Sequence, residues 1–320
     1  MESKVVVLGS GVIGLTTAVY FLELGVKVEM VFAESWENST SSQAGALWHP
    51  FLVKPSEKIR TWSMRSLINF QNLIKKNEGG VVSRNLTEYF PQDIEGIWWS
   101  KDMKNIEKLE KKSLPKEWQK SALKMTVPLI EPSLYMPYLL DRYRGQGGKV
   151  TQQRLSSFDD VTNDGSICIN CTGIGAKTLC NDLELFPIAG QTLLLSKNSE
   201  SEECFIDDSF ASEGYPTYIF PRSKDILIGG LALYNQSFLL PTEEASKDIL
   251  RRCNGISSSI LIDSKYKAQG GDRPGRSTVR LEIDQRNKNL IHNYGHSGSG
   301  YTLSWGCAEE AYKLYQKAIS

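Results

Sequence analysis

The chain opens on an apolar run that predicts a buried strand. Residues 4–8 are followed by a glycine-rich turn at residues 9–14, a helical stretch that ends near residue 24, and a second apolar run at residues 26–32. Apolar runs without alternation are typical of strands covered on both faces, as in parallel sheets. The order of strand, helix and strand therefore predicts a βαβ unit.

Helices and strands alternate along the next part of the chain, and the pattern then changes. Further helices are predicted at residues 56–74 and 131–144, and further strands of the same sheet at residues 149–155 and 167–171. Short runs separated by turn residues follow at residues 188–195, 218–220 and 226–231. Short strands in close succession favour an antiparallel sheet. The chain is therefore expected to fold as two lobes, the second inserted into the first.

Composition is typical of a globular protein with a small-molecule partner. Of 320 residues, 40% are hydrophobic and 23% are charged, and 37 basic residues balance 37 acidic ones. A balanced charge leaves no net field to attract nucleic acid or an anionic membrane. The seven lysines between residues 101 and 120 are interleaved with glutamates, and we interpret them as a solvated surface.

Targeting signals and cysteine usage favour a cytoplasmic protein. The first apolar run breaks at residue 9, which argues against a signal peptide or a membrane span there. The chain ends in Ala-Ile-Ser, which is not the Ser-Lys-Leu type of peroxisomal address. The six cysteines are scattered, form no disulfide framework and are expected to be reduced. The sequence leaves a homodimer open as the oligomeric state.

The first turn carries the Gly-x-Gly-x-x-Gly pattern of a dinucleotide-binding fold, at Gly9, Gly11 and Gly14. The first glycine permits a tight turn, the second lets a pyrophosphate approach, and the third allows the helix to pack closely on the strand. Glu34 ends the next strand, where an acid accepts hydrogen bonds from ribose hydroxyls. The pattern predicts a dinucleotide but does not separate NAD from FAD.

A second glycine-rich turn lies near the C-terminus, after an apolar run that starts at residue 290. Gly295, Gly298 and Gly300 let backbone amides approach a flat ligand. The helix that follows directs the positive end of its dipole at that ligand, and a reduced flavin carries the matching negative charge. The two turns together favour one FAD held by both ends of the chain.

These residues resemble the D-amino-acid oxidase family, FAD enzymes that oxidise D-amino acids. The resemblance spans essentially the whole chain, and its motifs match in order at residues 5–14, 46–48, 170–173, 273–274 and 290–308. It implies an α/β fold with a discontinuous, Rossmann-like FAD-binding domain and an inserted, mainly antiparallel α+β substrate domain. We assign residues 1–50, 133–187 and 275–320 to the FAD-binding domain, and residues 51–132 and 188–274 to the substrate domain.

The resemblance also assigns residues to the cofactor. The family's contacts to phosphates, ribose, adenine and the flavin ring correspond here to Gly9, Ser10, Gly11, Val12, Ile13, Gly14, Glu34, Ser35, Thr40, Ser41, Ala46, Leu47, Leu155, Arg273, Ser297, Gly298, Gly300, Tyr301 and Thr302. Glu34 replaces the family's more usual Asp, and the longer acid is expected to do the same task.

The substrate site is assigned by the same resemblance. Arg273 resembles the arginine that clamps the substrate carboxylate, and a planar guanidinium binds both carboxylate oxygens at once. Tyr218 resembles the tyrosine whose hydroxyl meets that carboxylate. These two and Gly298 are the predicted catalytic residues, and Phe51 and Ser297 complete the predicted substrate site.

No general base is needed for the implied reaction, because a hydride passes from the α-carbon of the neutral amine to the flavin. The protein's task is to orient the carboxylate so that only the D enantiomer points its α-hydrogen at the ring. Arg222 and Arg276 are interpreted as structural residues.

The chain departs from the family pattern at two places. Gly214 stands where many vertebrate members carry a lid tyrosine, and Tyr215 is one position off. Leu231 follows Gly229-Gly230, where members specific for D-aspartate carry a second arginine. Neutral or apolar substrate side chains are therefore expected.

Metal-binding patterns are weak. Cys168-x-x-Cys171 has no second pair of cysteines. His292 and His296 have the spacing of a zinc motif, but they flank a glycine-rich turn and do not share a helical face. We predict no metal site.

The sequence thus predicts FAD-dependent oxidative deamination of neutral or apolar D-amino acids by oxygen, giving 2-oxo acids, ammonia and hydrogen peroxide. The alternatives within the class are oxidases of glycine, sarcosine or D-aspartate. An NAD-dependent dehydrogenase would need a nicotinamide site that the C-terminal turn does not supply. A non-catalytic nucleotide-binding module would leave Arg273 and Tyr218 without a role.

Overall fold

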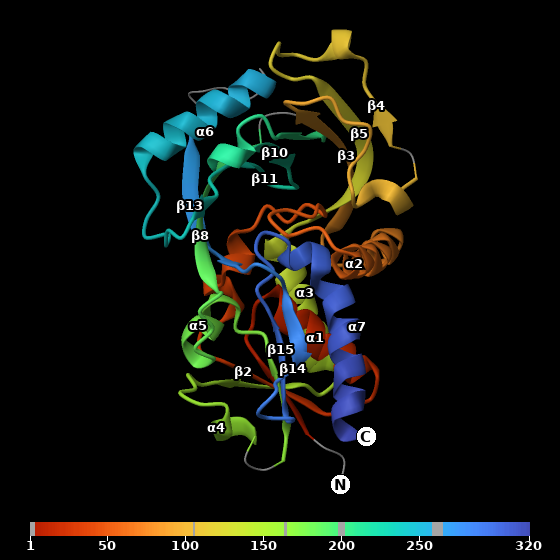
Figure 1. Cartoon of the computed structure of the whole chain (residues 1–320), viewed down its shortest axis with the longest axis vertical. Helices are drawn as coiled ribbons and strands as arrows, with labels where there is room; N and C mark the ends of the chain where they lie inside the picture. Colours follow the sequence, from red (N-terminus) through yellow and green to blue (C-terminus); the bar gives the residue numbers. More distant parts are fainter. Residues whose placement is uncertain (1–3, 105, 163–164, 198–201, 258–264) are drawn as a thin grey trace.

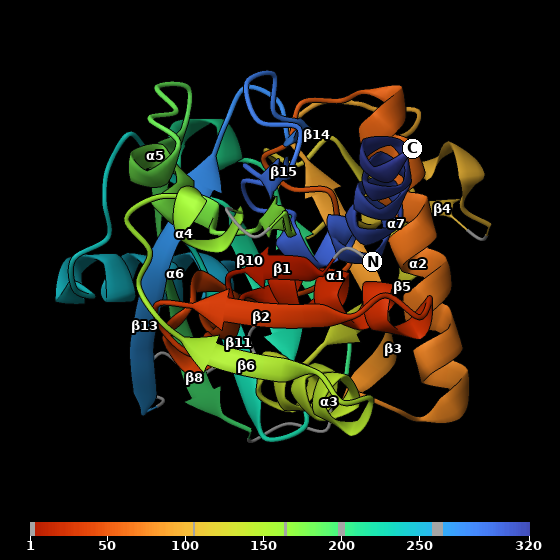
Figure 2. The same cartoon turned by 90° about the horizontal axis from the view of Figure 1, so that it is seen from below.

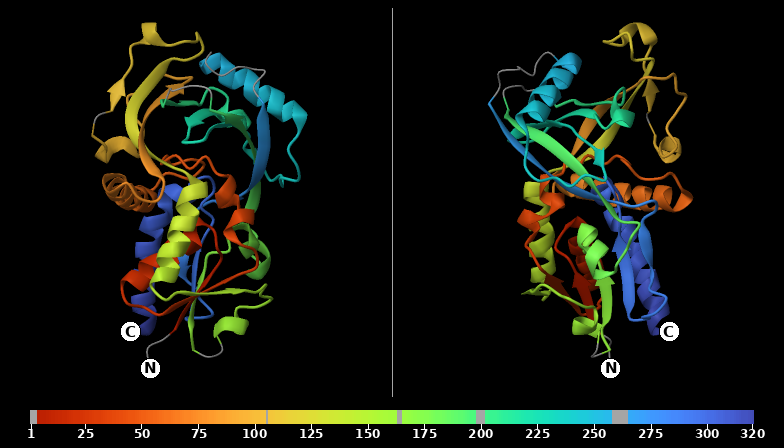
Figure 3. Two further views of the ribbon diagram at one scale, coloured as in Figure 1. Left: turned by 180° about the vertical axis from the view of Figure 1, so that it is seen from behind. Right: turned by 60° about the vertical axis from the view of Figure 1, so that its left-hand side comes forward.

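The computed structural model describes residues 4–104, 106–162, 165–197, 202–257 and 265–320. Its strands form two sheets in two tiers, and a helical layer lies between and beside them (Figure 1). Both views of Figure 3 show the upper sheet arching over the junction with the lower tier. The strands of the two sheets alternate along the chain, so each tier is built from separate segments.

The lower sheet has, among the described residues, the strand order β14-β15-β7-β1-β2-β6. Figure 2 views it from below, with β6, β2 and β1 one after another. All pairs are parallel except β14 with β15. The strands are β1 (Val5–Leu8), β2 (Val28–Phe32), β6 (Lys149–Gln152), β7 (Ile167–Asn170), β14 (Arg280–Ile283) and β15 (Leu290–Tyr294).

Helices cover both faces of this sheet because its strands are apolar on both sides. Val5 and Val7 face α1, α3 and α7, whereas Val6 and Leu8 face the short helices α4 and α5. Helix α1 packs against both α3 and α7 and is apolar around most of its circumference. The bounds are α1 (Val12–Glu23), α3 (Pro132–Gly145), α4 (Asp159–Thr162), α5 (Ala176–Leu179) and α7 (Gly300–Ile319).

The upper sheet has, within the described ranges, the order β12-β8-β11-β10-β9-β3-β5-β4, and β13 pairs with β8. Every pair is antiparallel except β3 with β9, which confirms the expected change of sheet type. The strands are β3 (Val81–Phe90), β4 (Glu107–Lys108), β5 (Ser121–Ile130), β8 (Phe186–Ser196), β9 (Cys204–Asp207), β10 (Thr217–Pro221), β11 (Asp225–Gly229), β12 (Leu233–Tyr234) and β13 (Tyr266–Gly275).

Two further helices flank the upper sheet. Helix α2 (Glu57–Lys76) is capped by Ser56, whose hydroxyl accepts a hydrogen bond from the Ile59 amide, as the sequence predicts. It packs on α7 where Gly306 meets the backbone of Trp62, a contact that a Cβ would obstruct. Helix α6 (Glu243–Ile256) lays Ile249, Leu250 and Cys253 on the sheet.

The sequence pattern alone did not predict the long β3–β5 pair or α6. The exposed segment of residues 101–120 lies beyond this pair, and its lysines are mainly exposed, in agreement with a solvated surface. The two sheets separate near the expected domain boundaries, but the boundaries themselves stay a prediction. In the described part of the chain, no helix is long and apolar enough to cross a membrane.

The start of α7 fixes a segment more than two hundred residues away in sequence. The Ser299 hydroxyl accepts a hydrogen bond from the Phe51 amide at 2.7 Å and donates one to the Phe51 carbonyl at 2.8 Å. Thr302 makes the same pair of bonds to His49, at 3.2 and 2.9 Å. We call these four bonds the α7 clamp. It holds residues 49–51 in one backbone conformation against the C-terminal turn.

Ser299→Ala should lower the free energy of unfolding by about 1–3 kcal/mol, because it leaves two backbone groups of Phe51 without partners. Ser304→Ala is the matched control: both serines are fully buried in the same part of the chain, but Ser304 donates only to the Tyr301 carbonyl within its own helix. Urea unfolding of both variants measures the difference. Equal losses would mean that the α7 clamp carries no special stability.

Candidate functional site

One cavity of about 900 Å³ runs from the first glycine turn to the underside of the upper sheet. A volume of this size is typical of a site for a cofactor or drug-sized ligand. Every residue predicted to hold cofactor or substrate lines it except Gly14: these are Gly9, Ser10, Gly11, Val12, Ile13, Glu34, Ser35, Thr40, Ser41, Ala46, Leu47, Phe51, Leu155, Tyr218, Arg273, Ser297, Gly298, Gly300, Tyr301 and Thr302.

The first glycine turn is built by close backbone approach. Gly9 has a φ of 108°, which disfavours any residue with a side chain, and a Cβ on it would press on the Cys171 carbonyl. A Cβ on Gly14 would overlap the Gly9 carbonyl. Gly14 therefore acts behind the cavity, by letting α1 lie directly on the turn, which is the packing role that the pattern predicts.

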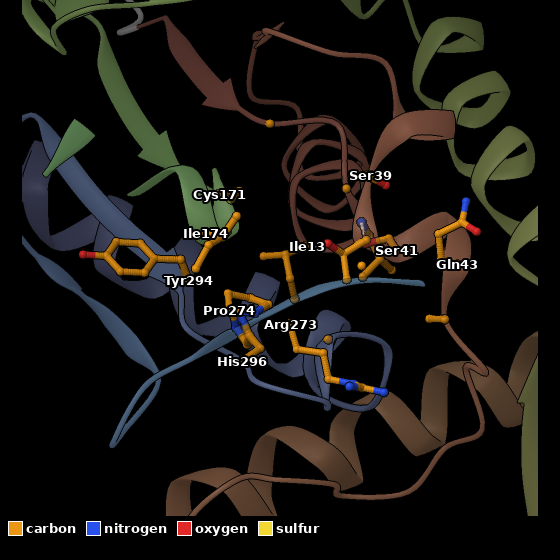
Figure 4. A pocket seen from close by; sticks show the side chains of 18 of the residues that line it. Ile13, Ser39, Ser41, Gln43, Cys171, Ile174, Arg273, Pro274, Tyr294 and His296 are labelled. Carbon is orange, nitrogen blue, oxygen red and sulfur yellow. Dashed lines mark hydrogen bonds between the residues drawn. The ribbon is translucent and has the colours of Figure 1, made fainter. Parts of the chain in front are cut away.

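The N-terminus of α1 opens on the cavity. Its N-cap residue, Gly11, has no side chain, and the Val12 amide instead donates to the Ser41 hydroxyl at 3.0 Å. A phosphate placed here would meet the positive end of the helix dipole together with this hydroxyl. Figure 4 shows Ile13, Ser39, Ser41 and Gln43 on this side of the cavity.

The opposite side of the turn supplies polar groups suited to a nucleoside. The Glu34 carboxylate pairs with Arg154 at 2.9 Å, and both side chains are largely exposed. The Ser10 hydroxyl donates to the Glu34 carbonyl at 2.7 Å and so fixes the end of β2. Leu155 and Ser35 complete this end. Arg154 was not predicted, because only the β2–β6 pairing brings it beside Glu34.

The middle of the cavity joins three segments through hydroxyl groups. The Thr40 hydroxyl donates to the Asp272 carbonyl at 2.8 Å, and the Tyr301 hydroxyl donates to the Ser41 carbonyl at 2.9 Å. These two hydrogen bonds hold the segments near residues 40, 272 and 301 together around the cavity. Thr40 keeps its oxygen lone pairs, so it can still accept a hydrogen bond there.

The C-terminal turn forms the wall that a flat ring would lie against. Ser297 and Ala46 both have positive φ, at 49° and 53°. The backbone at these two residues therefore does not continue a regular strand. No side chain caps the first amides of α7, since the Ser299 hydroxyl serves the α7 clamp. These amides and the helix dipole can stabilise negative charge that develops on a ring.

Three buried polar atoms of cavity-lining residues have no hydrogen-bond partner among the described residues: Asn293 Oδ1, His296 Nε2 and Thr192 Oγ1. An unpaired buried polar atom is costly, so such atoms mark places where a ligand supplies the missing bond. Burial lowers the pKa of His296 to about 3, so its imidazole is neutral at physiological pH. The dipoles, amides and unpaired atoms together fit a large polar cofactor with a flat ring.

Three of the predicted substrate residues, Arg273, Tyr218 and Phe51, rest on glycines. A Cβ on Gly190 would overlap the Arg273 guanidinium, and a Cβ on Gly229 or Gly230 would overlap the Tyr218 ring. A Cβ on Gly298 would overlap the ring of Phe51 in the same way. We call Gly190, the Gly229–Gly230 pair and Gly298 the glycine seats. They let large side chains lie flat against the backbone and leave the cavity open.

The surroundings of the Arg273 guanidinium suit the binding of an anion. Its Nη1 donates to the Leu231 carbonyl at 2.9 Å, and the guanidinium lies 5.8 Å from the Phe51 ring centroid. No carboxylate of the described residues pairs with it. The Tyr218 hydroxyl lies beside it, and burial, opposed by the Arg273 charge, raises the pKa of Tyr218. Figure 4 shows the guanidinium directed away from Tyr294.

Arg222 and Arg276, the two arginines interpreted as structural, have carboxylate partners. Arg222 is buried and pairs with Asp225 at 2.6 Å. Arg276 pairs with Asp182 at 3.0 Å, and neither arginine lines the cavity. Among the described residues, no group of three His, Cys, Asp or Glu side chains is arranged to hold a metal ion.

Some cavity residues were not among the predicted site residues. His49, Asp208, Gln43 and Ile174 also line the cavity. Asp208 follows β9, which the sequence pattern did not predict. His49 follows Trp48 directly, so its place in a predicted motif was the available signal.

Comparison with known proteins identifies the relationship. The family model of FAD-dependent oxidoreductases (DAO) matches residues 4–314. A D-amino-acid oxidase from Rubrobacter xylanophilus is 34% identical, covering 99% of this chain and 97% of that protein. A D-amino-acid oxidase from Dictyostelium discoideum is 31% identical, covering 99% of this chain and 92% of that protein.

Solved structures share the fold. The glycine oxidase of Geobacillus kaustophilus superposes with a TM-score of 0.83 at 15% sequence identity, over 98% of this chain and 95% of that chain. The resemblance to the D-amino-acid oxidase family is confirmed, and the cofactor is FAD, for which the two glycine turns and the unpaired polar atoms supply a fitting cavity. This chain belongs to the DAO family of FAD-dependent oxidoreductases.

Proposed function

We propose that this protein oxidises D-amino acids with neutral or apolar side chains to 2-oxo acids, ammonia and hydrogen peroxide. FAD, when bound, supplies the chemistry by accepting a hydride from the substrate α-carbon. The chain's own residues bind and orient the substrate. Molecular oxygen is the proposed electron acceptor. The compartment and the oligomeric state stay predictions.

One observation carries the proposal: the Arg273 guanidinium faces the cavity beside Tyr218 without a carboxylate partner among the described residues. A substrate carboxylate would complete it with two parallel charge-assisted hydrogen bonds. The Tyr218 hydroxyl stays protonated because its pKa is raised, so it can donate a further bond to the same carboxylate.

These contacts would fix the substrate by its carboxylate. With the carboxylate held, the α-hydrogen and the side chain exchange places between D and L enantiomers, so only one enantiomer points its hydrogen at the flavin. Phe51 lies against Arg273 and limits the motion of the guanidinium. Ser297 and Gly298 line the same end of the cavity, on the cofactor side.

Acidic side chains fit this site poorly. Gly229 and Gly230 seat the Tyr218 ring, and Leu231, the residue after them, contributes its carbonyl to Arg273 and carries no charge. Buried Arg252 donates to the Gly230 carbonyl, but its charge is paired with Asp248 and it does not line the cavity. Glycine and sarcosine remain alternative substrates, because the same carboxylate contacts would hold them.

The reaction is tested with the purified flavoprotein under anaerobic conditions. Adding D-alanine should bleach the visible flavin absorption, whereas L-alanine should leave it unchanged, because only the D enantiomer presents its α-hydrogen to the ring. Readmitting air should restore the colour and produce hydrogen peroxide. Bleaching by glycine or sarcosine alone would replace the proposed substrate, and bleaching by none would contradict the proposal.

Arg273→Met should keep bound FAD but raise KM for D-alanine about ten- to a hundredfold, since each hydrogen bond to a charged group contributes about 1.5–3 kcal/mol. Arg251→Met, on the exposed face of α6, is the matched control and should leave KM unchanged. Gly190→Ala should raise KM with Arg273 still present, because the added Cβ displaces the guanidinium. Steady-state kinetics measures all three, and an unchanged KM in Arg273→Met would remove that residue from the site.

A further inference from the structure

The substrate end of the cavity has an acidic group on the upper sheet, Asp208 with Glu88 and His49 beside it, which we call the acidic wall. Glu88, Ile206 and Tyr218 are register partners on the adjacent strands β3, β9 and β10. Partners on adjacent strands project from the same face of a sheet, and residues two apart on one strand do likewise. Asp208 directly follows β9, and its amide donates to the Tyr89 carbonyl of β3 at 3.0 Å, so the pairing and its alternation continue to this residue. Asp208, Ile206 and Tyr218 all line the cavity.

His49 and Glu88 lie beside Asp208, and His49 also lines the cavity. The His49 Nε2 atom contacts Glu88 Oε1 at 2.9 Å, and the Glu88 side chain is only 2% exposed. The other oxygen, Glu88 Oε2, has no hydrogen-bond partner among the described residues. The charges of Glu88 and His49 both act on the pKa of the Asp208 carboxyl, in opposite directions, so the three side chains form one buried group. Asp208 is the cavity-lining carboxyl of this group, and no arginine or lysine of the described residues forms an ion pair with it.

The distance from Tyr218 to Asp208 suits a long side chain. Asp208 lies one strand across and two residues along from Tyr218, which places their Cα atoms about 8 Å apart by the spacing of sheets. Ile206 and Pro216 line the cavity and supply apolar surface at this end. An aliphatic stem can pack there while a terminal charge reaches the carboxyl.

We propose that Asp208 selects D-amino acids with a cationic side chain, such as D-lysine, whose ammonium binds the Asp208 carboxylate while Arg273 and Tyr218 hold the α-carboxylate. The inference rests on the proposed function and adds cationic side chains to the neutral and apolar ones. Substrate charges would then be matched at both ends, a cation against Asp208 and an anion against Arg273.

Charge balance in the acidic wall supports this assignment. Burial, and then the charge of Glu88, raise the pKa of Asp208 to about 7; His49 opposes the rise and Asp207 adds to it. Burial lowers the pKa of His49, but the charge and hydrogen bond of Glu88 and the charge of Asp208 raise it above its ordinary value overall. A bound ammonium can therefore replace the proton of the Asp208 carboxyl without changing the net charge of the group.

The test compares D-lysine with D-2-aminoheptanoate, which places a methyl group where D-lysine has its ammonium. In the FAD-loaded enzyme at pH 8, kcat/KM should be about tenfold higher for D-lysine, in line with the strength of charge-assisted hydrogen bonds. Asp208→Asn should abolish the difference between the two substrates. Asp207→Asn is the matched control, since Asp207 projects from the other face and bonds to Gln119 and Ser209, so the difference should persist.

A second measurement needs no variant. Because the ammonium binds ionised Asp208, KM for D-lysine should fall as pH rises through about 7, whereas KM for D-2-aminoheptanoate should not follow it. Oxidation of D-alanine and D-2-aminoheptanoate without any advantage or pH signature for D-lysine would overturn the inference and leave the proposed function standing. Failure of every D-amino acid would instead contradict the proposed function.

Discussion

The whole site depends on the α7 clamp, the hydrogen bonds by which Ser299 and Thr302 hold His49 and Phe51. The clamp uses side-chain hydroxyls to satisfy backbone groups that belong to no sheet ladder. It leaves the first amides of α7 free to face the cavity, because the Ser299 hydroxyl does not cap them. One set of bonds therefore positions the wall of the cofactor site and also the backbone that carries Phe51.

The two sheets contribute different properties to the cavity. The parallel sheet ends in the tight turn of Gly9 and the exposed start of α1, so it offers dipoles and amides suited to phosphates. The antiparallel sheet offers a face of side chains whose register is fixed across several strands, from Glu88 to Tyr218. Under the proposed function, the cofactor is recognised mainly by backbone groups and the substrate by side chains spaced by the sheet.

Sequence reasoning identified the parts of the site whose chemistry is local. The turn at Gly9 to Gly14 and the turn before Gly300 each combine a strand, glycines and a helix within a few residues. Such a pattern can be recognised in the sequence alone. The acidic wall was missed because it arises from pairing: residue 88 meets residue 206 only through the parallel β3–β9 contact. No periodicity in the sequence indicates which strands become neighbours, and β3 and β9 were not predicted.

The glycine seats separate the residues that touch a ligand from the residues that decide where those side chains lie. Arg273 on β13 rests on Gly190 of β8, and Tyr218 on β10 rests on Gly229 of β11. A related protein could keep both contact residues and still bind a different substrate if a seat gained a methyl group. Inherited differences in specificity within this fold can therefore be located on the strand beneath the binding residue, where an inspection of ligand contacts alone would pass over them.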